Sequence, residues 1–275
     1  MGESVYGIVC SARNSGESDR RVVIFGPDCG KISALVRSAR KEKSKLAGAT
    51  RTFCEGRFHV NVSRGRGAGG AGRGDAAAVE AAGTRSAPLL IVSGVELRNS
   101  HKKVQSDIRC LAAGSFFLEL LESGHWPEDL WEPVFRLTVN ALRVLPDAYH
   151  HRHLACFVEA KLLKLSGVYP DFSSCAECGR PIVAGAAVVD RKSEHAYHDG
   201  CAPLTASGKI AGYETTADVV CALYRLADVA LAQYDSGWIG SAPPDSVEKT
   251  LWRMLAAMMD APLKSRRFLE EALGW

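Results

Sequence analysis

The sequence lacks any apolar run that approaches the roughly 20 residues needed to cross a bilayer. Residues 1–14 also lack the basic and then apolar layout of a secretory signal peptide. The chain is 47% hydrophobic and 24% charged, which is typical of a soluble globular protein. We therefore expect a cytoplasmic protein, and its 275 residues are enough for two domains.

Motifs of enzyme active sites are also missing. The sequence has no G-x-S-x-G nucleophile elbow and no phosphate-binding P-loop. A zinc deaminase would need a histidine two residues before a glutamate, and then P-C-x-x-C, but Ser174 precedes Cys175 and no H-x-E occurs. The sequence therefore offers no candidate catalytic centre, and we predict that the protein is not an enzyme.

The nine cysteines do not form the pattern of a disulfide framework. Six of them are scattered singly, which suits buried reduced thiols in a reducing compartment. These six are Cys10, Cys29, Cys54, Cys110, Cys156 and Cys221.

The other three cysteines stand in two short motifs, Cys175-x-x-Cys178 and His198-x-x-Cys201, with 19 residues between them. Each spacing lets a tight turn aim two ligands at one metal ion, and four ligands complete a closed tetrahedral site. We predict one structural zinc ion per chain, within a module at about residues 172–205. His195 is an alternative to His198 as the third ligand, and buried thiols with a surface histidine are the alternative without metal.

Residues 1–98 contain five short β-prone runs, separated by polar or glycine-containing turns. They lie at residues 5–10, 21–25, 31–36, 58–62 and 89–97. Five short strands predict a small closed barrel such as the OB-fold, which often binds single-stranded nucleic acid. An SH3-like barrel would give nearly the same pattern.

A segment rich in glycine, arginine and alanine interrupts this region at residues 64–88. It has few large side chains to pack, so we expect a flexible loop that either adds contacts of the RGG type or has no role. Its Gly65-x-Gly67-x-x-Gly70 matches a dinucleotide fingerprint in form. We reject that interpretation because more glycine follows where a helix should begin.

From residue 99 to residue 275 the apolar residues recur at helical spacing, which predicts an all-helical domain with the zinc loop inserted. The predicted helices start near Asp107, Pro127 and His150 and then cover 215–233, 246–259 and 265–273. His150, His151 and His153 lie together without a matching set of cysteines or carboxylates, so we interpret them as a helix start and not as a metal site.

Positive charge is concentrated near the N-terminus. Residues 1–98 have 16 lysines and arginines against 9 acidic residues, whereas residues 99–275 have 18 against 22. A cation cluster in the predicted barrel indicates a polyanion partner, and we expect it to bind DNA. The alternative for this cluster is a solvated charged face. Phe53 and Phe58 follow the cluster and are candidates for stacking on unpaired bases. Phe58 starts an alternating strand, so a position in the core is equally open for it. The cluster consists of Arg37, Arg40, Lys41, Lys43, Lys45 and Arg51.

Four segments, taken in order, resemble the RecO family of bacterial recombination mediators. They are Gly7-Ile8-Val9 with residues 16–20; Gly30-Lys31-Ile32 with residues 39–48; residues 162–170 leading into Cys175-x-x-Cys178-Gly179; and residues 263–269. Two features depart from the family pattern. His198 stands where many relatives have cysteine, and the 64–88 insert is additional.

The resemblance implies an N-terminal OB-fold, a helical domain and a zinc module. It also implies a role in DNA repair and homologous recombination: binding single- and double-stranded DNA, annealing complementary strands, and acting with RecR and single-strand-binding protein to load RecA. It implies a location in the cytoplasm, at the nucleoid. Two other functions stay open: a zinc-containing interaction scaffold without DNA binding, and a zinc-dependent enzyme acting on nucleic acid.

Overall fold

The computed structural model describes residues 3–62, 89–190, 195–206, 212–234, 244–259 and 262–274. The chain forms two compact units. The first consists of residues 1–106 and 118–142, and the second of residues 107–117 and 143–275. Helix α3 (Ile108–Ser123) contributes residues to both. The predicted boundary between residues 98 and 99 stays a prediction.

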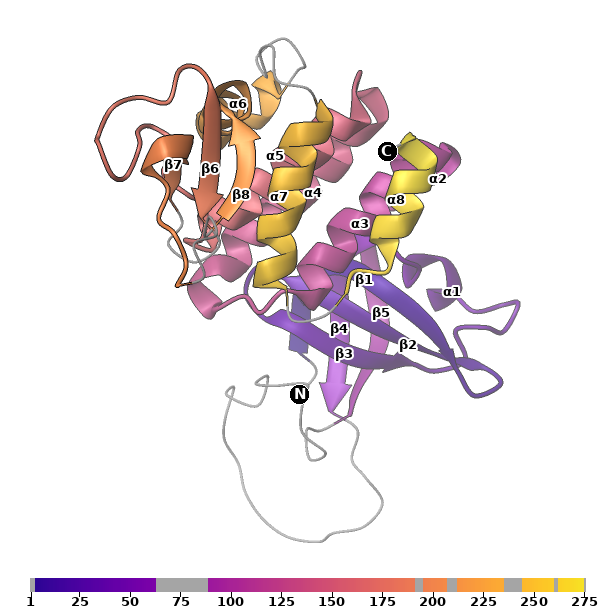
Figure 1. Ribbon diagram of the computed structural model, residues 1–275. Helices are drawn as coiled ribbons and strands as arrows, with labels where there is room; N and C mark the ends of the chain where they lie inside the picture. The colour runs from indigo at the N-terminus through magenta and orange to yellow at the C-terminus, as the bar shows by residue number, and fades with distance from the viewer. Residues whose placement is uncertain are drawn as a thin grey trace, which may run out of the picture. The chain divides into compact units, whose positions relative to one another are not determined.

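Five strands of the first unit close into a barrel (Figure 1). They are β1 (Glu3–Ser15), β2 (Asp19–Gly26), β3 (Gly30–Val36), β4 (Glu55–Val62) and β5 (Leu90–Asn99). The strand order is β1-β2-β3-β5-β4, and β1 pairs with β4 to close the ring. β3 and β5 are parallel, with Ala34 opposite Leu90, while the other pairs are antiparallel. This is a Greek-key barrel of the OB type, so the predicted fold class is confirmed.

Alternation along the strands builds the barrel core, because every second side chain points inward. Val22 and Ile24 of β2 and Phe58 and Val60 of β4 are buried in this way. At the start of β3, Gly30 has φ of +58°, and a Cβ there would lie 2.5 Å from the indole ring of Trp131. Only glycine meets both conditions at this turn.

The rest of the first unit is helical. It contains α1 (Leu46–Ala49) between β3 and β4, α2 (Lys102–Ser106), a 3-10 turn at Glu128–Leu130 and most of α4 (Trp131–Val144). Among the helices of the described ranges, none is long and apolar enough to cross a membrane.

The second unit is built around α5 (His151–Leu165), which is buried on most sides and packs against α6 (Ala217–Asp228) and α7 (Pro244–Met258). Helix α8 (Ser265–Leu273) follows, with the bounds expected from the sequence. In the described part of this unit, 3-10 turns lie at Leu145–Asp147, Asp199–Cys201 and Leu231–Gln233.

A three-stranded sheet, which the sequence pattern did not predict, lies in the second unit beside α6 (Figure 1). Its order is β7 (Ala196–His198), β6 (Ala186–Asp190) and β8 (Gly212–Thr216). Because β8 pairs with β6, the helix expected from residue 215 begins only at Ala217. It ends at Asp228, since the next residue, Val229, is extended.

Candidate metal centre and nucleic-acid interface

The four residues of the predicted zinc site lie together in the second unit. The sulfur atoms of Cys175, Cys178 and Cys201 and a ring nitrogen of His198 are all within 4.8 Å of one another. Cys178 Sγ lies 3.5 Å from His198 Nδ1. Two ligands of one tetrahedral zinc ion would be separated by roughly that distance, given bonds of about 2.0–2.3 Å.

Local backbone structure explains how two ligand pairs converge. After Cys175 the chain turns so that the Gly179 amide donates to the Cys175 carbonyl at 2.8 Å, and Gly179 takes φ of +70°. His198 ends β7, and Cys201 ends the 3-10 turn that follows directly. A CxxC turn and the end of a hairpin strand therefore present their ligands to the same point, as the spacing predicted.

The thiols of this cluster lie in a setting that favours the anionic form at Cys175. Burial opposes its ionisation, but backbone amides of Cys178, His198 and Glu177 donate to the sulfur, and the pKa of Cys175 falls to about 6. Three sulfur donors and one imidazole nitrogen make a closed ligand set that suits Zn²⁺ and is typical of structural sites.

His195, the alternative third ligand, is exposed and does not belong to the cluster. Its backbone pairs with Asp171 in an isolated bridge, and its carbonyl accepts the Asp190 amide at 3.0 Å. Among the described residues, the structure therefore brings His198 and not His195 to the three cysteines.

The predicted DNA-binding residues lie in the segment between β3 and β4, which we call the basic segment (residues 37–51). All six of its proposed contact residues are exposed: Arg37, Arg40, Lys41, Lys43, Lys45 and Arg51. The structure therefore leaves these cations accessible on one connection of the barrel.

The turn between β1 and β2 holds the start of the basic segment. The Arg40 amide donates to the Ser18 carbonyl at 2.9 Å, and the Arg40 guanidinium donates to the Gly16 carbonyl at 3.1 Å. The Ser38 amide donates to Asp19 Oδ1 at 2.8 Å. The connection between strands 1 and 2 is one of the loops with which OB-folds contact nucleic acid, and here it is joined to the basic segment.

Arg20 of β2 holds the other end of the segment and adds positive charge that the sequence prediction did not include. Its guanidinium donates to the Ala47 carbonyl at 2.8 Å and to Thr50 Oγ1 at 3.3 Å. Partial burial lowers the pKa of Arg20, and the nearby charges of Arg51 and Arg40 lower it further. The mutual repulsion indicates that these cations are close together.

The two phenylalanines considered for base stacking are not available for it. Phe53 is 3% exposed and Phe58 is 0% exposed, and Phe58 belongs to the core of the barrel. Phe58 follows the inward alternation of β4, which explains its burial. The expectation of stacking was therefore wrong for Phe53, whereas for Phe58 the alternative of a core position is confirmed.

The glycine- and arginine-rich insert at residues 64–88 lies outside the described residues, and so do Arg64, Arg66 and Arg73.

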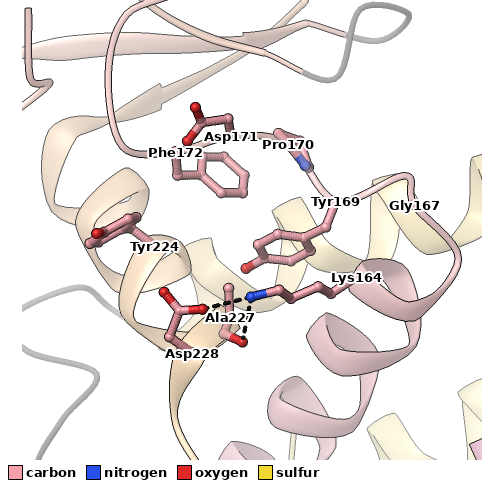
Figure 2. A pocket seen from close by; sticks show the side chains of 9 residues that line it. All are labelled: Lys164, Gly167, Tyr169, Pro170, Asp171, Phe172, Tyr224, Ala227 and Asp228. Atoms are coloured by element: carbon pink, nitrogen blue, oxygen red, sulfur yellow. Dashed lines mark hydrogen bonds and ion pairs between the residues drawn. The ribbon is translucent and has the colours of Figure 1, made fainter. Parts of the chain in front are cut away.

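A pocket of about 260 Å³ lies in the second unit, between the end of α5 and α6. Figure 2 shows Lys164 reaching Asp228, with which it forms an ion pair of 2.6 Å, and the aromatic rings of Tyr169 and Phe172 on the facing side. These two rings pack edge to face, 5.2 Å apart. Since its lysine is already paired, the pocket has the character of an aromatic cleft and not of a charged active site.

Comparison with known proteins connects both halves of the chain to one family. The family described as "Recombination protein O N terminal" matches residues 1–71, and "Recombination protein O C terminal" matches residues 105–266. The chain is 26% identical over 179 residues to the DNA repair protein RecO of an Exiguobacterium species, covering 65% of this chain and 63% of the relative. It is 27% identical over 178 residues to the protein of the same name from Bacillus cytotoxicus, covering 65% and 62%. The chain therefore spans less than two thirds of the length of these relatives.

Proposed function

This chain belongs to the RecO family, and from that premise we propose that it acts in DNA repair and homologous recombination. It binds single-stranded and double-stranded DNA, anneals complementary strands and helps to load a recombinase onto DNA coated with single-strand-binding protein. Its partners are RecR, single-strand-binding protein and, indirectly, RecA. The protein works in the cytoplasm, at the nucleoid.

The observation that supports this proposal is the exposed basic segment on an OB-type barrel. Its six cations are accessible, and hydrogen bonds fix the segment to β2 through Arg20 and to the β1–β2 turn through Arg40. Lysines and arginines that neutralise phosphates release condensed counterions, which drives binding irrespective of base sequence. DNA backbones of any sequence would therefore bind along this surface.

Annealing on such a surface needs no covalent chemistry. When cations neutralise the phosphates of two complementary strands, the repulsion between the strands falls and base pairing follows. The function is therefore that of a DNA-binding mediator and not that of an enzyme. Zinc, held by Cys175, Cys178, His198 and Cys201, fixes the shape of the module around β6 and β7.

Charge reversal in the basic segment tests the proposal. We choose Lys41→Glu with Lys43→Glu because both side chains are exposed, whereas Arg40 also holds the β1–β2 turn. Binding of a fluorescent single-stranded oligonucleotide is measured by anisotropy over a salt series. The double variant should bind more than about tenfold more weakly, and the slope of log K against log salt should fall by about 1.4.

The matched control reverses two exposed cations of the helical unit, Lys249→Glu with Arg267→Glu, so that the net charge changes equally. Its affinity should stay within about twofold of the wild type. Equal losses in both variants would point to a general charge effect. If the wild type itself does not bind DNA at moderate salt, the protein is an interaction scaffold and the proposal fails.

A further inference from the structure

A second group of metal-binding side chains lies in the helical unit, apart from the four residues of the zinc cluster. Asp107, Cys110 and His151 each offer one ligand atom, and these atoms lie within 4.8 Å of one another. Cys110 Sγ is 3.2 Å from His151 Nε2, which is close to the 3.5 Å between Cys178 Sγ and His198 Nδ1. The two clusters therefore have similar spacing between sulfur and nitrogen.

Two helix starts build this group. Asp107 directly precedes α3 and Cys110 lies in its first turn, so that the Asp-x-x-Cys spacing places both side chains at one end of the helix. His151 is the first residue of α5. His151 lies 41 positions after Cys110 in the sequence, which is why the sequence alone left the histidines without partners.

The carboxylate of Asp107 has two different roles at its two oxygen atoms. Asp107 Oδ1 accepts the amides of Arg109 and Cys110, at 2.8 and 3.1 Å, which caps the helix. Its second oxygen, Oδ2, has a long contact of 3.5 Å with the Arg109 guanidinium. The carboxylate therefore keeps an oxygen for a ligand while it holds the start of α3.

We propose that Asp107, Cys110 and His151 bind a second divalent transition metal, of the borderline class to which Zn²⁺ belongs. The site has three protein ligands and one position open to water or to a donor from a partner. Sulfur, imidazole nitrogen and carboxylate oxygen are the three ligand types that Zn²⁺ takes in proteins. A thiolate and a carboxylate together balance the charge of the ion, which suits a half-buried position.

Metal binding at this group must displace the proton of the Cys110 thiol, and the raised pKa of that thiol disfavours a different assignment. Burial, followed by the charge of Asp107, raises the pKa of Cys110 to about 11. Burial, followed by the charge of Arg109, lowers the pKa of His151. A Cys–His catalytic pair needs a thiol with a lowered pKa, so this group is not an activated nucleophile.

Metal counting by native mass spectrometry tests the site on the full chain, after chelation and reloading with Zn²⁺. The wild type should hold two ions and Cys110→Ser should hold one. Cys156→Ser is the matched control, because this buried cysteine of α5 belongs to neither cluster, and it should hold two.

Asp107→Asn serves as a second variant that keeps the fold, since asparagine also caps helices but lacks the ligand charge. Titration with Co²⁺, followed by thiolate-to-cobalt charge-transfer absorption, should show the second ion bound more than about tenfold more weakly. If Cys110→Ser and Asp107→Asn both bind metal as the wild type does, then Cys110 merely donates a hydrogen bond to His151 and the proposal fails. That failure leaves the DNA-binding proposal untouched, because the two tests share no residue.

Discussion

Arg266 of α8 and Glu159 of α5 form an ion pair of 3.2 Å in which both side chains are buried, with side-chain exposures of 7% and 0%. Arg266 also pairs with Glu248 of α7 and, at 2.9 Å, with Glu270. Its guanidinium lies over the ring of Trp252, 4.6 Å from the centroid. One arginine therefore joins α8 to the two helices at the centre of the second unit.

Replacing this arginine should destabilise the helical unit strongly. Arg266→Met removes the buried cation that pairs with Glu159, whereas Glu248 keeps Arg152 at 3.8 Å, and breaking a buried pair in this way costs about 3–5 kcal/mol. Urea denaturation followed by circular dichroism measures the loss. Arg267→Met is the control, since Arg267 is exposed and pairs with Glu271 on the same helix, and it should change the midpoint little. A small effect at Arg266 would show that α8 is held by its apolar contacts.

The same pair predicts a pH dependence of stability. Burial raises the pKa of Glu159 from 4.5 to about 8, although the charge of Arg266 opposes the shift. Its Oε2 is buried and has no hydrogen-bond partner among the described residues. Between these two pKa values the folded chain binds more protons than the unfolded chain, so the free energy of unfolding falls as pH rises from about 4.5 to 8.

Glu159→Gln should remove this component. We expect the stability difference between variant and wild type to shift in favour of the variant, on the order of a few kcal/mol, between pH 5 and 8. Urea midpoints at several pH values measure it, and the comparison cancels all other titrating groups. Parallel curves for the two proteins would contradict the raised pKa.

Two glycines of the first unit should respond oppositely to alanine. At Gly30 the positive φ and the ring of Trp131 both exclude a Cβ, so Gly30→Ala should cost at least about 1 kcal/mol. At Gly48, in the exposed helix α1, no heavy atom lies within 4 Å of the added Cβ, so Gly48→Ala should be neutral or stabilise by up to about 1 kcal/mol. Thermal unfolding followed by tryptophan fluorescence compares the two variants. Equal melting temperatures would mean that the β2–β3 turn relaxes freely.

On the proposal that Cys175, Cys178, His198 and Cys201 hold zinc, loss of the metal should loosen the module around β6 and β7 but not the barrel. Chelation, or His198→Ala, should speed proteolytic cleavage within residues 171–216, because four ligands no longer hold that segment. Readdition of Zn²⁺ should restore protection of the wild type only. His195→Ala is the matched control three residues away, and it should behave as the wild type. If His195→Ala speeds cleavage and His198→Ala does not, then His195 is the ligand and His198 is not.

Much of the fold could be predicted because its signals are local. Period-two alternation marked the barrel strands, and the run from Ser265 to Leu273 gave the bounds of α8. The β6–β8 sheet was missed because its strands are at most five residues long and pair only through tertiary structure. A short apolar run does not distinguish strand from loop until its partner is known.

Among the candidate sites, too, those formed by residues close in sequence could be predicted, and those that depend on tertiary structure could not. The convergence of Cys175, Cys178, His198 and Cys201 could be predicted since these residues come in two close pairs, whereas the group around Cys110 includes a histidine 41 positions away. Arg20 was missed because its role depends on the folding of the basic segment back onto β2. The prediction for Phe53 failed because this residue lies in the turn before β4, where burial depends on tertiary packing and not on strand alternation.

The parallel contact between β3 and β5 is the shortest ladder of the barrel among the described residues, pairing Ala34 with Leu90 and Leu35 with Ile91. Because this ladder joins fewer residue pairs than the others, we expect β3 and β5 to separate before the antiparallel strand pairs do. The β3–β5 ladder ends next to the end of β3, where the basic segment begins at residue 37. A DNA strand that pulls on the basic segment would therefore act on β3 directly beside this short ladder.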